Sequence, residues 1–68
     1  MQITLKAARV NANLTQKEVA ERLGVAEKSI SNWENGTHEI KLNALDGLCR
    51  IYNVDIGDII LPVSLAKH

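Results

Sequence analysis

The sequence predicts an all-α fold, a compact bundle of five helices formed by residues 1–68 as a single domain. Its 68 residues are too few for two domains, because chains divide only well above this size. Hydrophobic residues make up 46% of the chain and only Trp33 and Tyr52 are aromatic, so the core has to be built from aliphatic side chains. These apolar positions recur at helical rather than alternating spacing almost throughout.

Capping signals place the first two helices. The first is predicted over about residues 3–12, where apolar residues form one stripe. Thr15 and Glu18 then have the spacing of a capping box, in which each side chain accepts a hydrogen bond from the other residue's backbone amide. The second helix is therefore predicted over residues 16–23, and Gly24 is expected to end it in the left-handed conformation.

A third helix is predicted over about residues 27–34, directly after a short turn. Ile30 and Trp33 lie on its inward face, so the tryptophan is expected to pack in the core. Asn35 and Gly36 follow, and this pair is typical of the end of a helix.

Two further helices complete the predicted bundle. A stripe of apolar residues predicts a fourth helix over residues 42–53. Gly47 inside that stripe costs about 1 kcal/mol relative to alanine, unless a neighbouring helix uses the space that the missing side chain leaves. Asp55, with Asp58 three residues later, is expected to cap a short fifth helix that ends before Pro62.

The composition excludes several other classes of protein. Cys49 is the single cysteine, so an intrachain disulfide is excluded, a small buried hydrophobic role is expected for it, and the reducing cytoplasm is the expected compartment. With only two histidines beside it, no four-ligand zinc site can form, and no metal, cofactor or small-molecule ligand is expected. No apolar run approaches the roughly 18 residues of a membrane helix. No converging set of nucleophile, base or metal ligands indicates an enzyme.

The charges of the chain are balanced overall but unevenly spread. The net charge is zero, which by itself argues against a nucleic-acid partner. Residues 1–33 carry five basic and three acidic side chains, whereas residues 34–68 carry three basic and five acidic ones. This bias is weak, and alone it does not identify a protein that binds polyanions.

The second and third predicted helices form a helix-turn-helix. Residues 24–26 join them in a turn short enough to force a steep crossing, and Ala20 supplies the small side chain that this crossing needs. The segments LTQKEVAERLGV, SISNWENG and LNALDGLCRIYNVDIGDI resemble the Cro/repressor family, also called XRE-type, over about residues 5–61. The resemblance implies the fold of a phage-repressor DNA-binding domain. It also implies sequence-specific binding to double-stranded DNA as a transcriptional regulator, a repressor, with the third helix in the major groove.

Side chains on the outward face of the third helix are the implied base readers. Lysine can donate to guanine, asparagine can bond adenine through both of its amide atoms, and glutamate can accept from cytosine. A solvated helix face carries the same residue types, so it is the resemblance that favours base reading. The base-reading residues implied in this way are Glu27, Lys28, Ser29 and Asn32.

Phosphate contacts are implied on both sides of that helix. Gln16, at the positive end of the second helix, resembles a family glutamine that contacts the DNA backbone and braces the reading helix. The alternative is simple capping by Thr15 with an idle Gln16, and the residues after the reading helix can equally form an ordinary solvated loop. The phosphate-contacting set implied by the resemblance is Thr15, Gln16, Asn35, Thr37, His38 and Lys41.

Other positions carry structural implications of the resemblance. Arg9 and Glu34 match positions that pair in several family members, so a structural ion pair is expected between the first helix and the end of the third. Ala26 stands where many relatives carry serine or threonine, and the third helix therefore lacks the usual side-chain cap. Residues 37–40 replace the basic residues that relatives often have, which weakens nonspecific attraction to phosphate.

Apolar residues after the fourth helix predict a symmetric homodimer on a near-palindromic operator. They supply more apolar side chains than a short terminal helix can bury against a small core, and an exposed apolar patch usually marks a partner site. The alternative is that these isoleucines close the core of the monomer while residues 62–68 form a loose tail. The candidates for the dimer interface are Ile59, Leu61, Val63 and Leu65.

A second function stays open from the sequence. In this alternative the chain is an antitoxin-like or adaptor module, in which the acidic second half binds another protein and DNA contact is secondary. The two functions differ in their response to salt, because DNA binding weakens steeply as the ionic strength rises whereas apolar docking does not.

Overall fold

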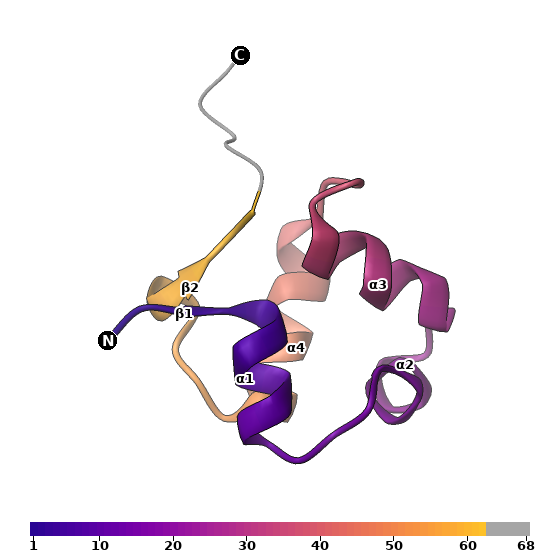
Figure 1. Ribbon diagram of the computed structural model, residues 1–68, viewed down its shortest axis with the longest axis horizontal. Coiled ribbons are helices and arrows are strands. Elements are labelled where there is room, and N and C mark those ends of the chain that lie inside the picture. Colours follow the sequence, from indigo (N-terminus) through magenta and orange to yellow (C-terminus); the bar gives the residue numbers. More distant parts are fainter. Residues whose placement is uncertain (63–68) are drawn as a thin grey trace.

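The computed structural model describes residues 1–62, and the helices of this part are arranged around one small core (Figure 1). A short strand precedes the first helix, and a 3-10 turn and a second short strand follow the last one. Val63 and Leu65, two of the predicted dimer-interface residues, lie outside the described residues. The elements in chain order are β1 (Ile3–Thr4), α1 (Leu5–Asn11), α2 (Gln16–Leu23), α3 (Glu27–Asn35), α4 (Leu42–Tyr52), η1 (Ile56–Asp58) and β2 (Ile59–Ile60).

The prediction of a fifth helix is wrong. Within the described residues there are four α-helices, and the segment after α4 forms only the single 3-10 turn η1 and then the strand β2. Asp55 precedes η1 without making a side-chain cap. The β-branched side chains of Ile59 and Ile60 favour extended backbone, and β1 lies beside them as a parallel partner, with Ile3 opposite Ile59.

The same pairing corrects the start of the first helix. Residues 3 and 4 were predicted to be helical, but they are extended in β1 and α1 begins at Leu5. The hydroxyl oxygen of Thr4 accepts a hydrogen bond of 3.1 Å from the amide of Ala7, which caps α1. One threonine therefore serves as both the last residue of a strand and the cap of a helix.

Local signals at the ends of α2 act as predicted. The amide of Glu18 donates to the Thr15 hydroxyl oxygen at 3.1 Å, and the amide of Thr15 donates to the Glu18 carboxylate at 2.8 Å. Gly24 ends the helix at φ +78°, a left-handed conformation that glycine adopts without steric penalty. Ala26 precedes α3 without a side-chain cap, also as predicted.

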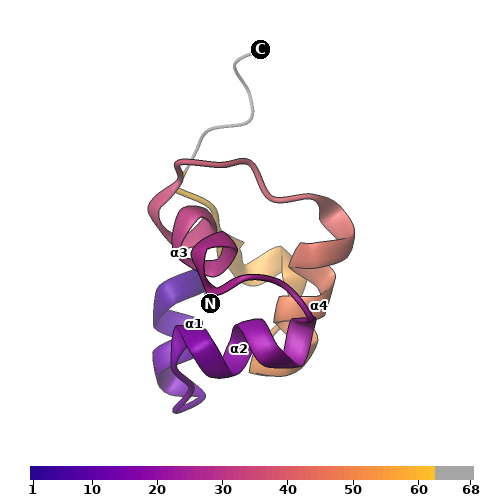
Figure 2. The ribbon, with the colours of Figure 1, turned by 90° about the vertical axis from the view of Figure 1, so that its right-hand side faces the viewer.

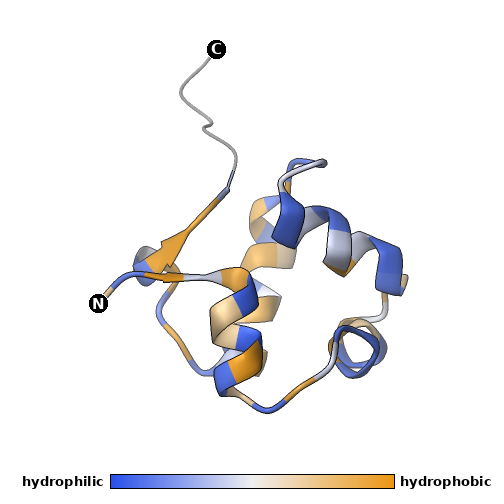
Figure 3. Ribbon diagram, viewed as in Figure 1, coloured by the Kyte–Doolittle hydropathy of each residue, from blue (hydrophilic) through white to orange (hydrophobic). Residues whose placement is uncertain are grey.

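The core is aliphatic, as the composition predicted, and it lies where the four helices meet. Cys49 is buried in it as a small hydrophobic residue, and Trp33 packs against it from α3 while remaining partly exposed. Hydrophilic positions predominate along α2 and α3 in Figure 3, and hydrophobic ones along β1, β2 and parts of α1 and α4. The buried residues are Leu5, Ala8, Val19, Ala20, Ile30, Leu45, Leu48, Cys49 and Tyr52.

Helices α2 and α4 pack against each other (Figure 2), and Gly47 lies in α4. A Cβ atom added to Gly47 would lie 2.6 Å from Cδ1 of Leu23, which is closer than real Cβ contacts. The neighbouring helix therefore occupies the space that a side chain at this position would need. This contact explains why glycine, a poor helix former, stands inside α4.

Candidate nucleic-acid interface

Helices α2 and α3 lie on one side of the molecule, and Figure 2 turns this side toward the viewer. The end of α3 leads into the loop of residues 36–41, beyond which α4 begins. Ile30 is 1% exposed and holds the inner face of α3 against the core. The opposite face of α3 carries the exposed Glu27, Lys28 and Asn35 and the partly buried Ser31 and Asn32.

Of the predicted base readers, two are exposed and two are partly buried. Glu27 and Lys28 are exposed in the first turn of α3, and their opposite charges mean that this end of the helix is not uniformly basic. Ser29 is partly buried. Asn32, also partly buried, is joined to the following loop because the Thr37 hydroxyl lies 3.0 Å from its side-chain oxygen.

The predicted phosphate-contacting residues fall into two groups in the structure. The hydroxyl oxygen of Thr15 is used in the capping box, and the amide nitrogen of Gln16 is used in a bond to Glu34. The others lie at the end of α3 or in the loop after it and are all exposed; Asn35, the last residue of α3, donates to Ser31 at 3.3 Å, and the Thr37 hydroxyl bonds back to Asn32. This exposed group is Asn35, Thr37, His38 and Lys41.

Arg9 and Glu34 are brought together across α1 and α3. Nε of Arg9 donates to Oε2 of Glu34 at 2.6 Å, and Nη2 donates to Oε1 at 3.2 Å, so the guanidinium engages both carboxylate oxygens. The Glu34 side chain is 3% exposed and that of Arg9 12% exposed. The hydrogen bond that Arg9 donates to Glu34 raises the pKa of Arg9 above its usual value, so the guanidinium stays protonated.

Two further groups join this ion pair, and sequence reasoning did not find their contacts. Nη1 of Arg9 donates to the backbone oxygen of Leu14 at 2.9 Å, which ties α1 to the segment just before α2. Nε2 of Gln16 donates to Oε1 of Glu34 at 2.9 Å, across 18 residues of sequence. The start of α2 and the end of α3 are thus held by one buried carboxylate.

The Tyr52 hydroxyl is buried in the same region of the core. No group among residues 1–62 forms a hydrogen bond with it. Burial, with a smaller contribution from the charge on Glu34, raises its pKa to about 12. Because the ordinary pKa of tyrosine is about 10, the folded protein keeps this proton in a pH range where the unfolded chain releases it.

Replacement of Tyr52 by phenylalanine is expected to change the alkaline stability of the protein. A raised folded-state pKa stabilises the fold below pH 10, and this stabilisation is lost as the pH rises from about 10 to 12. The Tyr52→Phe variant does not lose stability in this way. Its free energy of unfolding, measured by urea titration, should therefore rise relative to that of the wild type between pH 9 and pH 11. At pH 7 the variant should lie within about 1 kcal/mol of the wild type. A difference that does not change with pH would contradict the assignment.

The predicted dimer residues are only partly available on the surface. Ile59 and Leu61 are partly buried and pack against the core, Ile59 as part of the β1–β2 pair. Ile56 and Ile60, in contrast, are 41% and 42% exposed. Among the described residues after α4, the exposed large apolar side chains are therefore those of Ile56 and Ile60.

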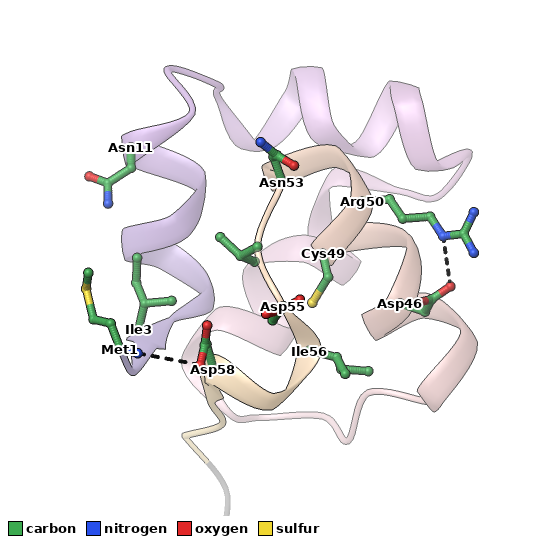
Figure 4. A pocket seen from close by; sticks show the side chains of 11 residues that line it. Met1, Ile3, Asn11, Asp46, Cys49, Arg50, Asn53, Asp55, Ile56 and Asp58 are labelled. Atoms are coloured by element: carbon green, nitrogen blue, oxygen red, sulfur yellow. Dashed lines mark hydrogen bonds and ion pairs between the residues drawn. The ribbon is translucent and has the colours of Figure 1, made fainter.

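A wide groove of about 710 Å³ lies apart from α2 and α3, since none of its lining residues belongs to either helix (Figure 4). Three aspartates line it, together with Ile3 and Ile56. Asp46 is paired with Arg50 at 3.1 Å, and Asp58 lies 3.6 Å from the amino group of Met1. The groove is thus partly acidic and partly apolar.

Residues 1–62 contain no group of three or more histidine, cysteine, aspartate or glutamate side chains able to hold a metal ion. No helix among them has both the length and the apolar character needed to cross a membrane.

Comparison with known proteins gives a consistent set of matches. A family model described as helix-turn-helix matches residues 5–59. The antitoxin PezA of Streptococcus pneumoniae is 36% identical over 56 residues, which are 82% of this chain and 35% of that protein. An HTH-type transcriptional regulator of Archaeoglobus fulgidus is 33% identical over 61 residues, which are 90% of this chain and 86% of the relative.

A third relative is the cryptic phage CTXphi transcriptional repressor RstR of Vibrio cholerae. It is 32% identical over 56 residues, which are 82% of this chain and 50% of that protein. The chain therefore spans half or less of the length of RstR and PezA. Among solved structures, none matches the chain at a significant level.

Proposed function

Because the chain belongs to the Cro/repressor-type, or XRE-type, helix-turn-helix family, we propose that it binds a specific sequence of double-stranded DNA and represses transcription. The observation that carries this proposal is how α3 is attached to the rest of the domain. Its inner face is held by Ile30 and its end by Glu34, while its outer face carries the exposed Lys28 and the partly buried Asn32. A helix supported in this way can enter the major groove as a rigid element. Repression is favoured by the similarity to RstR, which is described as a transcriptional repressor.

In this proposal the outer face of α3 reads bases and its surroundings hold phosphate. Lys28 donates to guanine and Asn32 bonds adenine, with Glu27 and Ser29 beside them. The phosphate set keeps Thr15, Gln16, Asn35, Thr37, His38 and Lys41. The capping box uses the amides of Thr15 and Glu18, so the amides of Gln16 and Lys17 have no intrahelical acceptor and can donate to phosphate.

Alanine substitutions separate the two roles. Lys28→Ala and Asn32→Ala should each cost about 1–3 kcal/mol of binding free energy on the preferred duplex and relax its sequence preference. Gln16→Ala should weaken binding to all sequences alike. Lys6→Ala is the matched control, because Lys6 is an exposed lysine on α1.

The measurement begins with selection of bound fragments from random duplexes, followed by titration of the selected duplex and of a scrambled one. Unchanged affinity and unchanged preference for both Lys28→Ala and Asn32→Ala would show that α3 does not read bases through these residues. Failure of the wild-type chain to enrich any duplex would remove the DNA-binding proposal itself.

The proposed complex is a homodimer on a near-palindromic operator. A two-fold arrangement sets two copies of α3 in successive major grooves about 34 Å apart. Ile56 and Ile60 are the exposed large apolar side chains among the described residues after α4. We place the contact between copies there, together with the predicted Ile59, Leu61, Val63 and Leu65.

Charge substitutions test the dimer. Ile60→Lys should convert a two-to-one complex on the selected duplex into a one-to-one complex in sedimentation experiments, because it buries an unpaired charge between the copies. Val10→Lys is the control, since Val10 is 53% exposed on α1, outside the proposed contact. A one-to-one wild-type complex on a site with no inverted repeat, unaffected by Ile60→Lys, would rule out the dimer.

The second candidate function is an antitoxin-like protein-interaction module. Two observations favour it. The chain is similar to the antitoxin PezA, and a groove away from α3 is lined by three aspartates and two isoleucines. Salt separates the two functions, because affinity for DNA falls with the logarithm of the salt concentration in proportion to the number of phosphates contacted. A partner protein whose binding is insensitive to salt would favour this second function.

A further inference from the structure

We infer that Glu34 is a positioning residue for DNA binding, because its buried carboxylate holds the Gln16 side chain in one orientation at the start of α2. This inference rests on the proposed function and deepens it. It assigns to Glu34 a role beyond its ion pair with Arg9, and it concerns a residue whose side chain is only 3% exposed.

The orientation follows from the chemistry of the two groups. Oε1 of Glu34 accepts hydrogen bonds from Nε2 of Gln16 at 2.9 Å and from Nη2 of Arg9 at 3.2 Å, while Oε2 accepts from Nε of Arg9 at 2.6 Å. An ionised carboxylate has no hydrogen to donate, so only the nitrogen of the Gln16 amide can face it. A flipped amide would set two acceptor oxygens against each other.

The consequence for DNA concerns which atom of Gln16 a phosphate can meet. A phosphodiester oxygen also only accepts, so the side-chain oxygen of Gln16 cannot bind it. The second hydrogen on Nε2 remains, next to the unpaired backbone amides of the first turn of α2. Glu34 therefore keeps the donor edge of Gln16 beside these amides before DNA arrives, and binding need not order a free glutamine.

Arg9 makes this arrangement rigid. With only 3% of its side chain exposed, Glu34 has almost no contact with water, and two hydrogen bonds from Arg9 fix its carboxylate. The third bond of Arg9, to the Leu14 oxygen, fixes the segment that leads into α2. The same guanidinium thus contacts both the Glu34 carboxylate and the segment that leads to Gln16.

A double-mutant cycle on DNA affinity distinguishes positioning from a purely structural role. The background variant is Arg9→Met with Glu34→Met, which removes both charges together and leaves no unpaired buried ion. Gln16→Ala is then made in the wild type and in this background. Affinity for the selected duplex is measured by fluorescence anisotropy at a temperature where circular dichroism shows every variant folded.

In the wild type, Gln16→Ala should weaken binding between about threefold and tenfold, the range expected for losing one pre-ordered side chain. In the double-methionine background the same substitution should weaken binding less than about twofold, since Gln16 is no longer held. Equal losses in both backgrounds would overturn the inference while leaving the DNA-binding proposal intact. Only the absence of duplex binding by the wild type would remove both.

A second measurement needs neither DNA nor a stable double variant. The chain has two glutamines, Gln2 and Gln16, and Gln2 is exposed. In nuclear magnetic resonance relaxation of the free wild-type protein, the Gln16 side-chain amide should be rigid and that of Gln2 mobile. Glu34→Met should make the two alike. A wild-type Gln16 amide as mobile as that of Gln2 would overturn the inference.

Discussion

Arg9→Met alone is expected to lower the free energy of unfolding by about 3–5 kcal/mol, because it leaves the Glu34 carboxylate buried and unpaired. Glu34→Leu should cost less, since the longer Arg9 side chain is 12% exposed and can turn its guanidinium toward water. The double variant Arg9→Met, Glu34→Leu buries no charge. It should therefore be more stable than the Arg9→Met variant.

Urea unfolding of the three variants at pH 7 measures this coupling. The matched control is Arg50→Met, because Arg50 also pairs with a carboxylate, at 3.1 Å to Asp46, but 81% of its side chain is exposed. An exposed pair of this kind contributes at most about 1 kcal/mol. Additive losses from Arg9→Met and Glu34→Leu, or a loss for Arg50→Met as large as that for Arg9→Met, would contradict the role assigned to the buried pair.

Ile30→Ala is expected to lower the free energy of unfolding by about 2–5 kcal/mol, through lost burial and the cavity that it leaves. Ile30 is 1% exposed and is the buried residue of α3. A chain of this size has a total stability of roughly 3–10 kcal/mol, so this loss is a large part of it. The helix proposed to read DNA thus also contributes, through Ile30, a large part of the stability of the domain.

A smaller truncation at the same position keeps this prediction measurable when the Ile30→Ala variant is largely unfolded. Ile30→Val should cost about 0.5–1.5 kcal/mol. The exposed Lys28, two residues earlier on the same helix, gives the control, since Lys28→Ala should stay within about 0.5 kcal/mol of the wild type. Denaturation midpoints in urea rank the four proteins. Equal midpoints for Ile30→Ala and Lys28→Ala would show that α3 is not anchored through Ile30.

Some contacts of the site were predictable from the sequence, and others were not. The resemblance pointed to Arg9 and Glu34 as partners, and the structure brings them together. It also pointed to Gln16 as a glutamine that contacts phosphate and braces the reading helix, but it did not name Glu34 as the residue that Gln16 bonds. The bond from Gln16 to Glu34 could not be foreseen from spacing, because the two residues are 18 positions apart on different helices and no periodic pattern relates them.

The sequence by itself determined the helices whose ends carry their own hydrogen-bonding signals. Thr15 and Glu18 start α2 and Gly24 ends it, as predicted, because capping boxes and left-handed glycines act over three or four neighbouring residues. The aliphatic core follows in the same way from the 3.6-residue repeat of apolar positions, which gives each helix one face to bury.

Tertiary structure alone decided the features that need a partner from a distant part of the chain. Residues 59 and 60 become a strand instead of a fifth helix because Ile3 and Thr4, more than fifty positions earlier, lie beside them. Gly47 leaves room for the Leu23 side chain of another helix, which would have to shift if a Cβ atom were added here. Each of these outcomes depends on which surfaces meet after the helices have packed. They could not be predicted from local spacing, because the residues that form these contacts are distant in sequence.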